Sequence, residues 1–214
     1  MRHFLPLILA ALLTAGAATA QTRPTVTPTR DVAVTYRASG QGAASEIRMS
    51  WLPARNLMRM DMPGGQGWML VDTNAGTGFM VMEAQRLIMD LPRNQMPTPG
   101  ITPSQNARFT REATARIANT DCINWRVQDQ GEDARICLTA DGVMLRAESL
   151  SGQAAGRGML EATAVAYGAQ DPARFQRPAG FQTFQLPAGI APGPGQNLPR
   201  GTALPPPGVT IPGR

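Results

Sequence analysis

The sequence predicts a mainly β protein built as one curved antiparallel sheet of about ten strands with little helix. Two observations support this. Apolar and polar residues alternate with a period of two through much of the segment 31–187, which is the pattern of strands with one buried face. Turn residues such as Ser39-Gly40 and Asp141-Gly142 separate these segments. Short loops of this kind join antiparallel neighbours.

The chain divides into four predicted parts, beginning with a signal peptide at 1–20. A short start with Arg2 leads into an apolar run, Leu5–Leu13, and then into the small-residue cleavage site Ala18-Thr19-Ala20. The run is too short to span a bilayer, so we favour cleavage over an uncleaved anchor. The other parts are an extended lead-in (21–30), the β-rich domain (31–187) and a Pro/Gly-rich tail (188–214) expected to be disordered. The mature protein is therefore expected to be periplasmic or secreted.

Strands are predicted in order along the domain. The alternation is clearest at 31–37, 46–51, 58–62 and 86–91, and further strands are expected near 109–118, 122–128, 133–139, 143–150 and 158–167. Two segments, Trp68–Val71 and Phe79–Val81, are apolar on both faces. Such strands need cover on both sides or line a cavity. The only helix expected is a short one near Asp171–Phe175, so the cover must be a loop, a curled sheet or a ligand.

Cys122 and Cys137 are predicted to form a disulfide across a hairpin, because two cysteines in an exported chain are expected to pair. With the two cysteines opposite each other, Arg126 faces Asp133 and a four-residue loop, 128–131, closes the turn. One face of the hairpin is then almost wholly apolar. The spacing is unlike that of redox-active pairs, so we interpret the bond as a structural staple contributing about 3 kcal/mol.

The composition excludes several chemistries. The 20 basic residues are all Arg, the net charge is +5, and the only histidine is His3 in the predicted signal peptide. Imidazole-based catalysis and imidazole metal sites are therefore excluded from the mature chain. The arginines are scattered, so no nucleic-acid partner is expected. The acidic residues are spread along the chain and no Gly-x-Ser-x-Gly motif occurs, so we predict no enzyme, no catalytic residues, no cofactor and no metal site.

Methionines recur at a spacing of two, at Met58, Met60 and Met62 and again at Met80 and Met82. Packing is the simplest interpretation, because this spacing is the inward face of a strand and methionine fills irregular apolar space. A cavity that accepts variable apolar ligands is a second interpretation. Binding of Cu(I) by the thioethers is a third.

Several segments together resemble a bacterial envelope family of unknown function (DUF4412-like) with a LolA/LolB-like half-barrel fold. They are RMDMP (59–63), VDTNAGTGFMVMEAQRLIMDLP (71–92), DCINWRV (121–127), ARICLTADGVMLRAES (134–149) and LEATAVAYG (160–168). The resemblance is strongest at a set of motif positions: Cys122, Trp125, Cys137, Leu138, Thr139, Asp141 and Gly142. It implies a curved antiparallel half-barrel and an envelope location. No functional residue is carried over, and the chain lacks the N-terminal helix and plug helices of the lipoprotein carriers.

The sequence thus predicts a non-enzymatic envelope protein with a lipid or other apolar small molecule on the concave face of its sheet. The candidate face residues are Trp51, Met58, Met60, Leu70 and Met82. The alternative is a structural or interaction protein of the envelope, with the Pro-rich tail as a tether or a segment that binds an envelope protein partner. Copper binding is the third hypothesis.

Overall fold

The computed structural model describes residues 23–39, 44–93, 103–151 and 159–184. The predicted signal peptide, the tail 188–214 and the first residues of the lead-in lie outside these ranges. In the described ranges twelve strands form one sheet in the order β12-β6-β5-β4-β3-β2-β1-β11-β10-β9-β8-β7. Their bounds are β1 Val32–Ser39, β2 Ser45–Leu52, β3 Leu57–Asp61, β4 Gly67–Asp72, β5 Thr77–Met82, β6 Leu87–Leu91, β7 Arg108–Ile117, β8 Thr120–Asp129, β9 Glu132–Leu138, β10 Met144–Ser149, β11 Met159–Tyr167 and β12 Gln182–Phe184.

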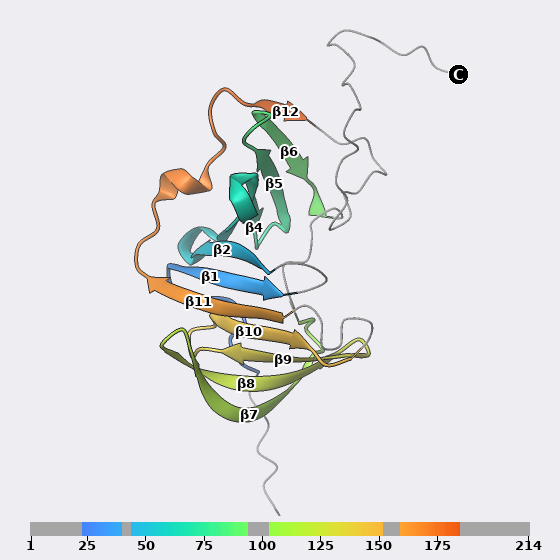
Figure 1. Ribbon diagram of the computed structural model, residues 1–214. Helices are drawn as coiled ribbons and strands as arrows, with labels where there is room; N and C mark the ends of the chain where they lie inside the picture. The colour runs from blue at the N-terminus through green and yellow to red at the C-terminus, as the bar shows by residue number, and fades with distance from the viewer. Residues whose placement is uncertain (1–22, 40–43, 94–102, 152–158, 185–214) are drawn as a thin grey trace, which may run out of the picture.

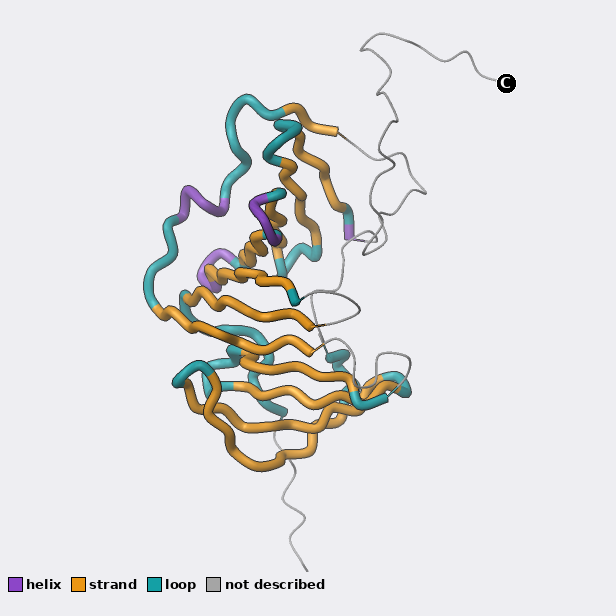
Figure 2. The backbone as a smooth tube through the Cα atoms, viewed as in Figure 1, coloured by secondary structure: helices purple, strands orange, loops and turns teal. Residues whose placement is uncertain are grey.

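The predicted fold class, a mainly β protein with a curved antiparallel sheet, is confirmed. All neighbouring strands pair antiparallel except β12, which lies parallel to β6. The strand number is twelve rather than about ten, and β12 is a three-residue strand without a recognisable alternation. The described helices are short 3₁₀ turns: η1 Pro53–Arg55, η2 Pro63–Gly65 and η5 Pro172–Phe175 (Figure 2). None of the described helices is long and apolar enough to cross a membrane.

The sheet curls around one core. In Figure 1, β7–β11, β1 and β2 lie stacked one above another, and β4–β6 turn steeply away from them. β7 contacts β11, although β8, β9 and β10 separate these two strands in the sheet. A flat sheet could not bring them together. A central buried cluster includes Val34, Met49 and Met89, and we call the side of β1–β6 that carries it the concave face.

The convex side of β4–β6 is covered by the segment that follows β11. Trp68, Leu70 and Phe79 alternate along their strands with residues of the central cluster and form a second cluster with Phe175 of η5. Phe181 packs against the same cluster. An irregular segment thus covers the outer side of the strands that are apolar on both faces. A loop was one of the three kinds of cover that the sequence predicted.

One side of β7–β10 is covered from the other end of the chain. Phe109, Trp125 and Ile136 form a third cluster, and Val26 of the lead-in packs against it. The lead-in passes close to Gly142, where an added Cβ would lie 2.3 Å from the carbonyl oxygen of Thr27. Only glycine leaves room for this approach.

The β8–β9 hairpin corrects the predicted register. Asn124 lies opposite Cys137, Arg126 opposite Arg135, and Asp129 opposite Glu132. The strands are therefore shifted by two residues from the prediction, and a two-residue turn, Gln130-Gly131, replaces the four-residue loop. Both turn residues have positive φ, 50° and 86°, as a tight hairpin turn requires. A shift of two keeps every side chain on its predicted face.

Candidate functional site

Five methionines lie side by side across five neighbouring strands. Met49 of β2 pairs with Met60 of β3, Met60 with Met69 of β4, Met69 with Met80 of β5, and Met80 with Met89 of β6. Residues directly opposite in antiparallel strands project from the same face. We call these five residues the methionine row. It runs across the concave face, because Met49, Met69 and Met89 belong to the central cluster.

The methionine row alternates between deep and accessible positions. Met49, Met69 and Met89 are buried, with exposed fractions of 6%, 3% and 5%. Met60 and Met80, which lie between them, are half-buried and pack on the same cluster. The row is therefore neither fully enclosed by the chain nor fully open, and the side chains that a ligand could touch are those of Met60 and Met80.

Four of the five predicted face residues lie beside or in this row. Met60 is part of it, Met58 is buried in the central cluster, and Trp51 and Met82 are half-buried against that cluster. Trp51 pairs with Met58 across β2 and β3. The structure thus brings these four residues to the concave face.

Leu70 does not lie on the concave face, and its prediction as a lining residue is corrected. It pairs with Arg59 and Phe79 and is buried in the convex cluster with Trp68. The physical reason is strand alternation, since Met69 points to the concave side and its neighbour must point away. Because Trp68–Val71 is apolar throughout, no pattern in the sequence distinguishes the residues of one side from those of the other.

Three residues of the row, Met49, Met69 and Met89, were not among the predicted candidates. Met49 and Met89 were placed correctly on the apolar side of their strands, but nothing in the sequence aligned them with Met60 and Met80. The alignment of these five residues depends on how the strands pair, and strand pairing cannot be read from a single sequence.

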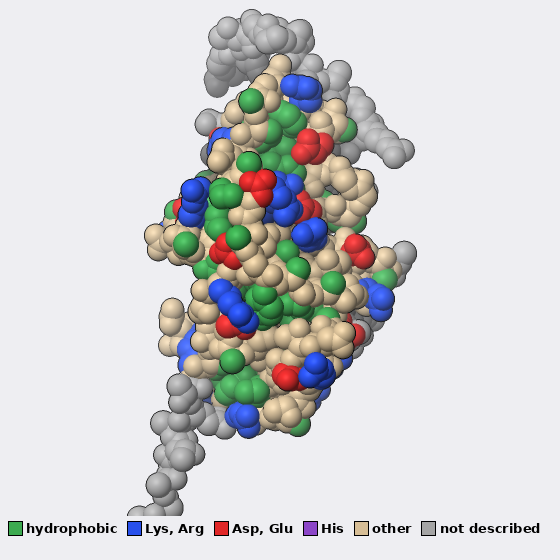
Figure 3. All heavy atoms as spheres, turned by 90° about the vertical axis from the view of Figure 1, so that its left-hand side faces the viewer, with side chains coloured by type: hydrophobic (Ala, Val, Ile, Leu, Met, Phe, Trp, Pro, Cys, Tyr) green, Lys and Arg blue, Asp and Glu red, His purple; other side chains and the backbone are tan. Residues whose placement is uncertain are grey.

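The charged groups of β3 and β6 project from the opposite face. Asp61 accepts hydrogen bonds from Arg59 Nε at 2.7 Å and from Arg174 at 2.8 Å, and the Arg59 guanidinium lies 3.9 Å from the Trp68 ring centroid. Arg177 pairs with Asp90. These contacts fasten the segment of η5 to the convex side and leave the methionine row in apolar surroundings. In Figure 3, charges of both signs are interspersed with hydrophobic side chains on the face shown.

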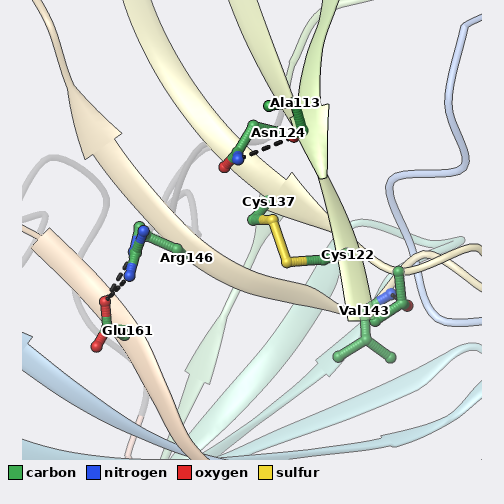
Figure 4. The surroundings of a disulfide bond; sticks show 8 residues. Ala113, Cys122, Asn124, Cys137, Val143, Arg146 and Glu161 are labelled. Atoms are coloured by element: carbon green, nitrogen blue, oxygen red, sulfur yellow. Dashed lines mark hydrogen bonds and ion pairs between the residues drawn. A yellow bond between two sulfur atoms is a disulfide. The ribbon is translucent and has the colours of Figure 1, made fainter. Parts of the chain in front are cut away.

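The disulfide predicted from the sequence joins β8 to β9. Cys122 and Cys137 are bonded with Cα atoms 5.5 Å apart, and both are buried in the central cluster. Nearby, Arg146 donates to Glu161 at 2.7 Å (Figure 4). Asn124 donates to the carbonyl oxygen of Ala113 at 3.0 Å. The described chain holds no free cysteine. The disulfide is packed in the central cluster, and the ion pair of Arg146 with Glu161 lies nearby.

Two acidic residues of the described ranges are held by local hydrogen bonds. Arg126 holds the pKa of the Asp133 carboxyl below its usual range by hydrogen bonding. Hydrogen bonds from Ser104 do the same for the pKa of Asp129. Throughout the described ranges, no three His, Cys, Asp or Glu side chains gather closely enough to hold a metal ion.

Comparisons with known proteins support the fold. An uncharacterised conserved protein from Thermus thermophilus is similar over 73% of this chain and 91% of its own, with a TM-score of 0.52 and 15% identity. MucB is similar over 73% of this chain and 60% of its own, with a TM-score of 0.53 and 14% identity. The Pseudomonas aeruginosa MucA/MucB complex matches over 74% of this chain and 59% of the matched chain, with a TM-score of 0.51 and 15% identity.

This chain thus spans about three fifths of the length of MucB. No protein-family model matches the sequence, and no curated protein matches it. At 14–15% identity these likenesses show the fold alone. The curved open sheet that the sequence predicted is therefore one that solved proteins share.

Proposed function

We propose that this chain is an exported, non-enzymatic envelope protein that binds an apolar ligand, such as the acyl chain of a lipid, on its concave face. The binding surface is formed by the methionine row with Trp51, Met58 and Met82. The observation that carries the proposal is the row itself, in which half-buried Met60 and Met80 stand between buried methionines. The proposal includes membership of the envelope family that the sequence resembles and cleavage after Ala20.

The chemistry of methionine supports this choice. Its unbranched thioether side chain adapts to different apolar shapes, so a row of methionines suits a ligand of variable length or branching. A ligand that covers apolar area gains about 25 cal/mol per Å² removed from water. The ionic groups of β3 and β6 face the other side of the sheet, so an apolar ligand would displace no ion pair.

A titration with a dansyl-labelled long-chain fatty acid tests the proposal. The double variant M60Q/M80Q puts two polar amides at the accessible positions of the row, and we expect it to lose at least about tenfold in affinity. M144Q is the matched control, because Met144 is also half-buried but lies in β10 and packs on the third cluster, outside the methionine row. If the unmodified chain does not bind the probe, or if M60Q/M80Q binds as tightly as M144Q, the proposal is wrong.

The second candidate is an interaction protein of the envelope. MucB, which shares the fold, is known in a complex with MucA. In this chain the Pro-rich segment 188–214 is the proposed partner-binding element. A pull-down from envelope extract with the full chain and with a chain ending at 187 tests the idea. Loss of a reproducible partner on truncation supports it, and recovery of the same partner by both chains removes the tail's role.

The proposed location has its own test. N-terminal sequencing of the protein from the periplasmic fraction is expected to start at Gln21, as cleavage after Ala20 requires. A chain retained at the membrane with Met1 intact would contradict export by a cleaved signal.

A further inference from the structure

We propose that the middle of the methionine row, Met60, Met69 and Met80, is a site for a soft monovalent metal ion, Cu(I) or its analogue Ag(I). The three residues stand directly opposite one another on three adjacent strands. Their thioether sulfurs would be the ligands. This inference is independent of the apolar ligand proposed above, since it depends on sulfur chemistry and not on apolar surface.

The geometry follows from the register. Neighbouring strands lie about 4.8 Å apart, so three successive methionines span about 10 Å between their outer Cα atoms. Each side chain has three rotatable bonds before its methyl group and reaches sideways along the sheet. The outer two sulfurs can therefore turn toward the central one and enclose a single ion. The sequence had drawn attention to methionines along one strand, at Met58, Met60 and Met62, whereas the register places the better set across strands.

Accessibility also favours the middle of the row. Met69 is 3% exposed and would form the floor of the site. Met60 and Met80 are half-buried on either side of it, which leaves an approach from solvent. At the ends of the row, Met49 and Met89 each have a methionine on only one side: Met49 pairs with Val34 and Met60, and Met89 pairs with Met80 and, in β12, with Phe184. The ends therefore cannot be the centre of three thioethers, and of the three remaining centres only Met69 is a buried methionine with a half-buried methionine on either side.

The donor set determines which metal can bind. Thioethers are soft ligands that select Cu(I), whereas Zn(II) and harder ions require imidazole, thiolate or carboxylate. The cysteines are joined in a disulfide, the only histidine is His3, and Asp61 and Asp90 project from the opposite face. A monovalent ion also costs less than a divalent ion to take out of water into apolar surroundings. The site should thus discriminate strongly against Zn(II).

The test is an anaerobic competition titration with Cu(I) and a chromophoric Cu(I) chelator, using the full mature chain. The triple variant M60L/M69L/M80L removes the sulfurs but keeps the volume and apolarity of the row. Substitution of methionine by leucine in a core usually costs less than about 1.5 kcal/mol, so this variant is expected to fold. Retained far-ultraviolet circular dichroism and a cooperative urea transition check that it does.

We expect the unmodified chain to withdraw one equivalent of Cu(I) from the chelator and the triple variant to bind it at least about tenfold more weakly. M49L/M89L, which alters only the ends of the row, and M144L, in the third cluster, should bind Cu(I) like the unmodified chain. Zn(II) should not compete. The proposal is overturned if the unmodified chain takes no Cu(I) from the chelator, or if the triple variant binds as tightly.

The two proposals for this face fail separately. In the triple leucine variant the sulfurs are lost but the surface remains apolar, so its affinity for Cu(I) should fall by a much larger factor than its affinity for the dansyl-labelled fatty acid, whereas M60Q/M80Q should lose fatty acid binding. If the triple leucine variant loses Cu(I) binding and largely keeps fatty acid binding, the row binds the metal through its sulfurs and the fatty acid through its apolar surface. A chain that binds fatty acid but no Cu(I) keeps the proposed function and removes the metal site.

Discussion

The two halves of the sheet are held together in different ways. Across β2–β6 the concave face carries flexible methionines, and the ion pairs of these strands, such as Arg59 with Asp61, project from the convex side. Across β7–β10 the central cluster contains the disulfide, and Arg135, two residues before Cys137, is held between Glu112 at 2.8 Å and Glu148 at 2.7 Å. We call these regions the methionine half and the stapled half.

The difference indicates that the stapled half is fixed in one arrangement and that the methionine half can adapt. A covalent link and paired charges restrict the stapled half to one arrangement, because an ion pair that loses a partner leaves an uncompensated charge. Methionines have no such requirement and can repack around a guest. A small domain can thus hold an adaptable surface beside a covalently fixed one, which is why we place ligand binding on the methionine half.

A substitution in the segment that covers the convex side of the methionine half should have the largest effect on stability. Phe175 is 4% exposed in the convex cluster, and Phe175→Ala is expected to lower the free energy of unfolding by about 3–5 kcal/mol through loss of burial and cavity formation. Urea denaturation followed by tryptophan fluorescence measures it. Gln176→Ala, at the exposed next position, is the control and should stay within about 0.5 kcal/mol. A loss below about 1 kcal/mol for Phe175→Ala would mean that η5 does not hold this half together.

Removal of the disulfide should have the next largest effect on stability. Replacing both cysteines, C122S/C137S, opens a link between residues 15 positions apart and is expected to lower the free energy of unfolding by about 3 kcal/mol. Urea denaturation with and without reductant measures the loss. Reductant should destabilise the unmodified chain by a similar amount and leave the variant unchanged. Equal stability of the oxidised chain and the variant would show that the disulfide does not stabilise the stapled half.

A smaller effect is expected where the two halves meet. Tyr36 is fully buried and its hydroxyl donates to the carbonyl oxygen of Met144 at 2.7 Å. Tyr36→Phe leaves that carbonyl without its donor and should cost about 1–3 kcal/mol. Tyr167→Phe is the control, since Tyr167 is 37% exposed and water can replace its bond to Asp141. The comparison fails if both variants unfold at the same urea concentration.

The smallest effect concerns acid stability of the stapled half. Arg126 lowers the pKa of Asp133 below its ordinary value. A lowered pKa in the folded state contributes stability that is present above the ordinary pKa and is lost as the pH falls through the lowered value. Asp133→Asn should therefore flatten the decline of stability below about pH 4. Gln176→Ala, at an exposed position and without a change of titratable group, should keep the decline of the unmodified chain, and an unchanged decline in Asp133→Asn would refute the assignment.

Most strands could be predicted from the sequence because alternation reports directly on burial. Glu46–Trp51 and Leu87–Leu91 alternate clearly, and both form strands. The apolar and polar faces of the β8–β9 hairpin were also predicted correctly, although its register was not. The register depended on the turn at Gln130-Gly131, and a non-glycine residue with positive φ is not evident from composition.

The candidate site was predicted only in part, for a related physical reason. Alternation places Met60 and Met82 on an apolar face, but it cannot say which residues of other strands lie beside them. The row arises from four consecutive registers, each set by its own turn. Leu70 was misplaced because its strand is apolar on both sides, and β12 was missed because three residues are too few to show a period.

Native mass spectrometry of the protein purified from the periplasm without detergent tests the central claim most directly. The account predicts a chain that carries an excess mass corresponding to an apolar molecule, and loss of that excess in M60Q/M80Q but not in M144Q. A bare mass for the unmodified chain, together with no binding of the dansyl-labelled fatty acid added afterwards, would contradict ligand binding on the methionine half.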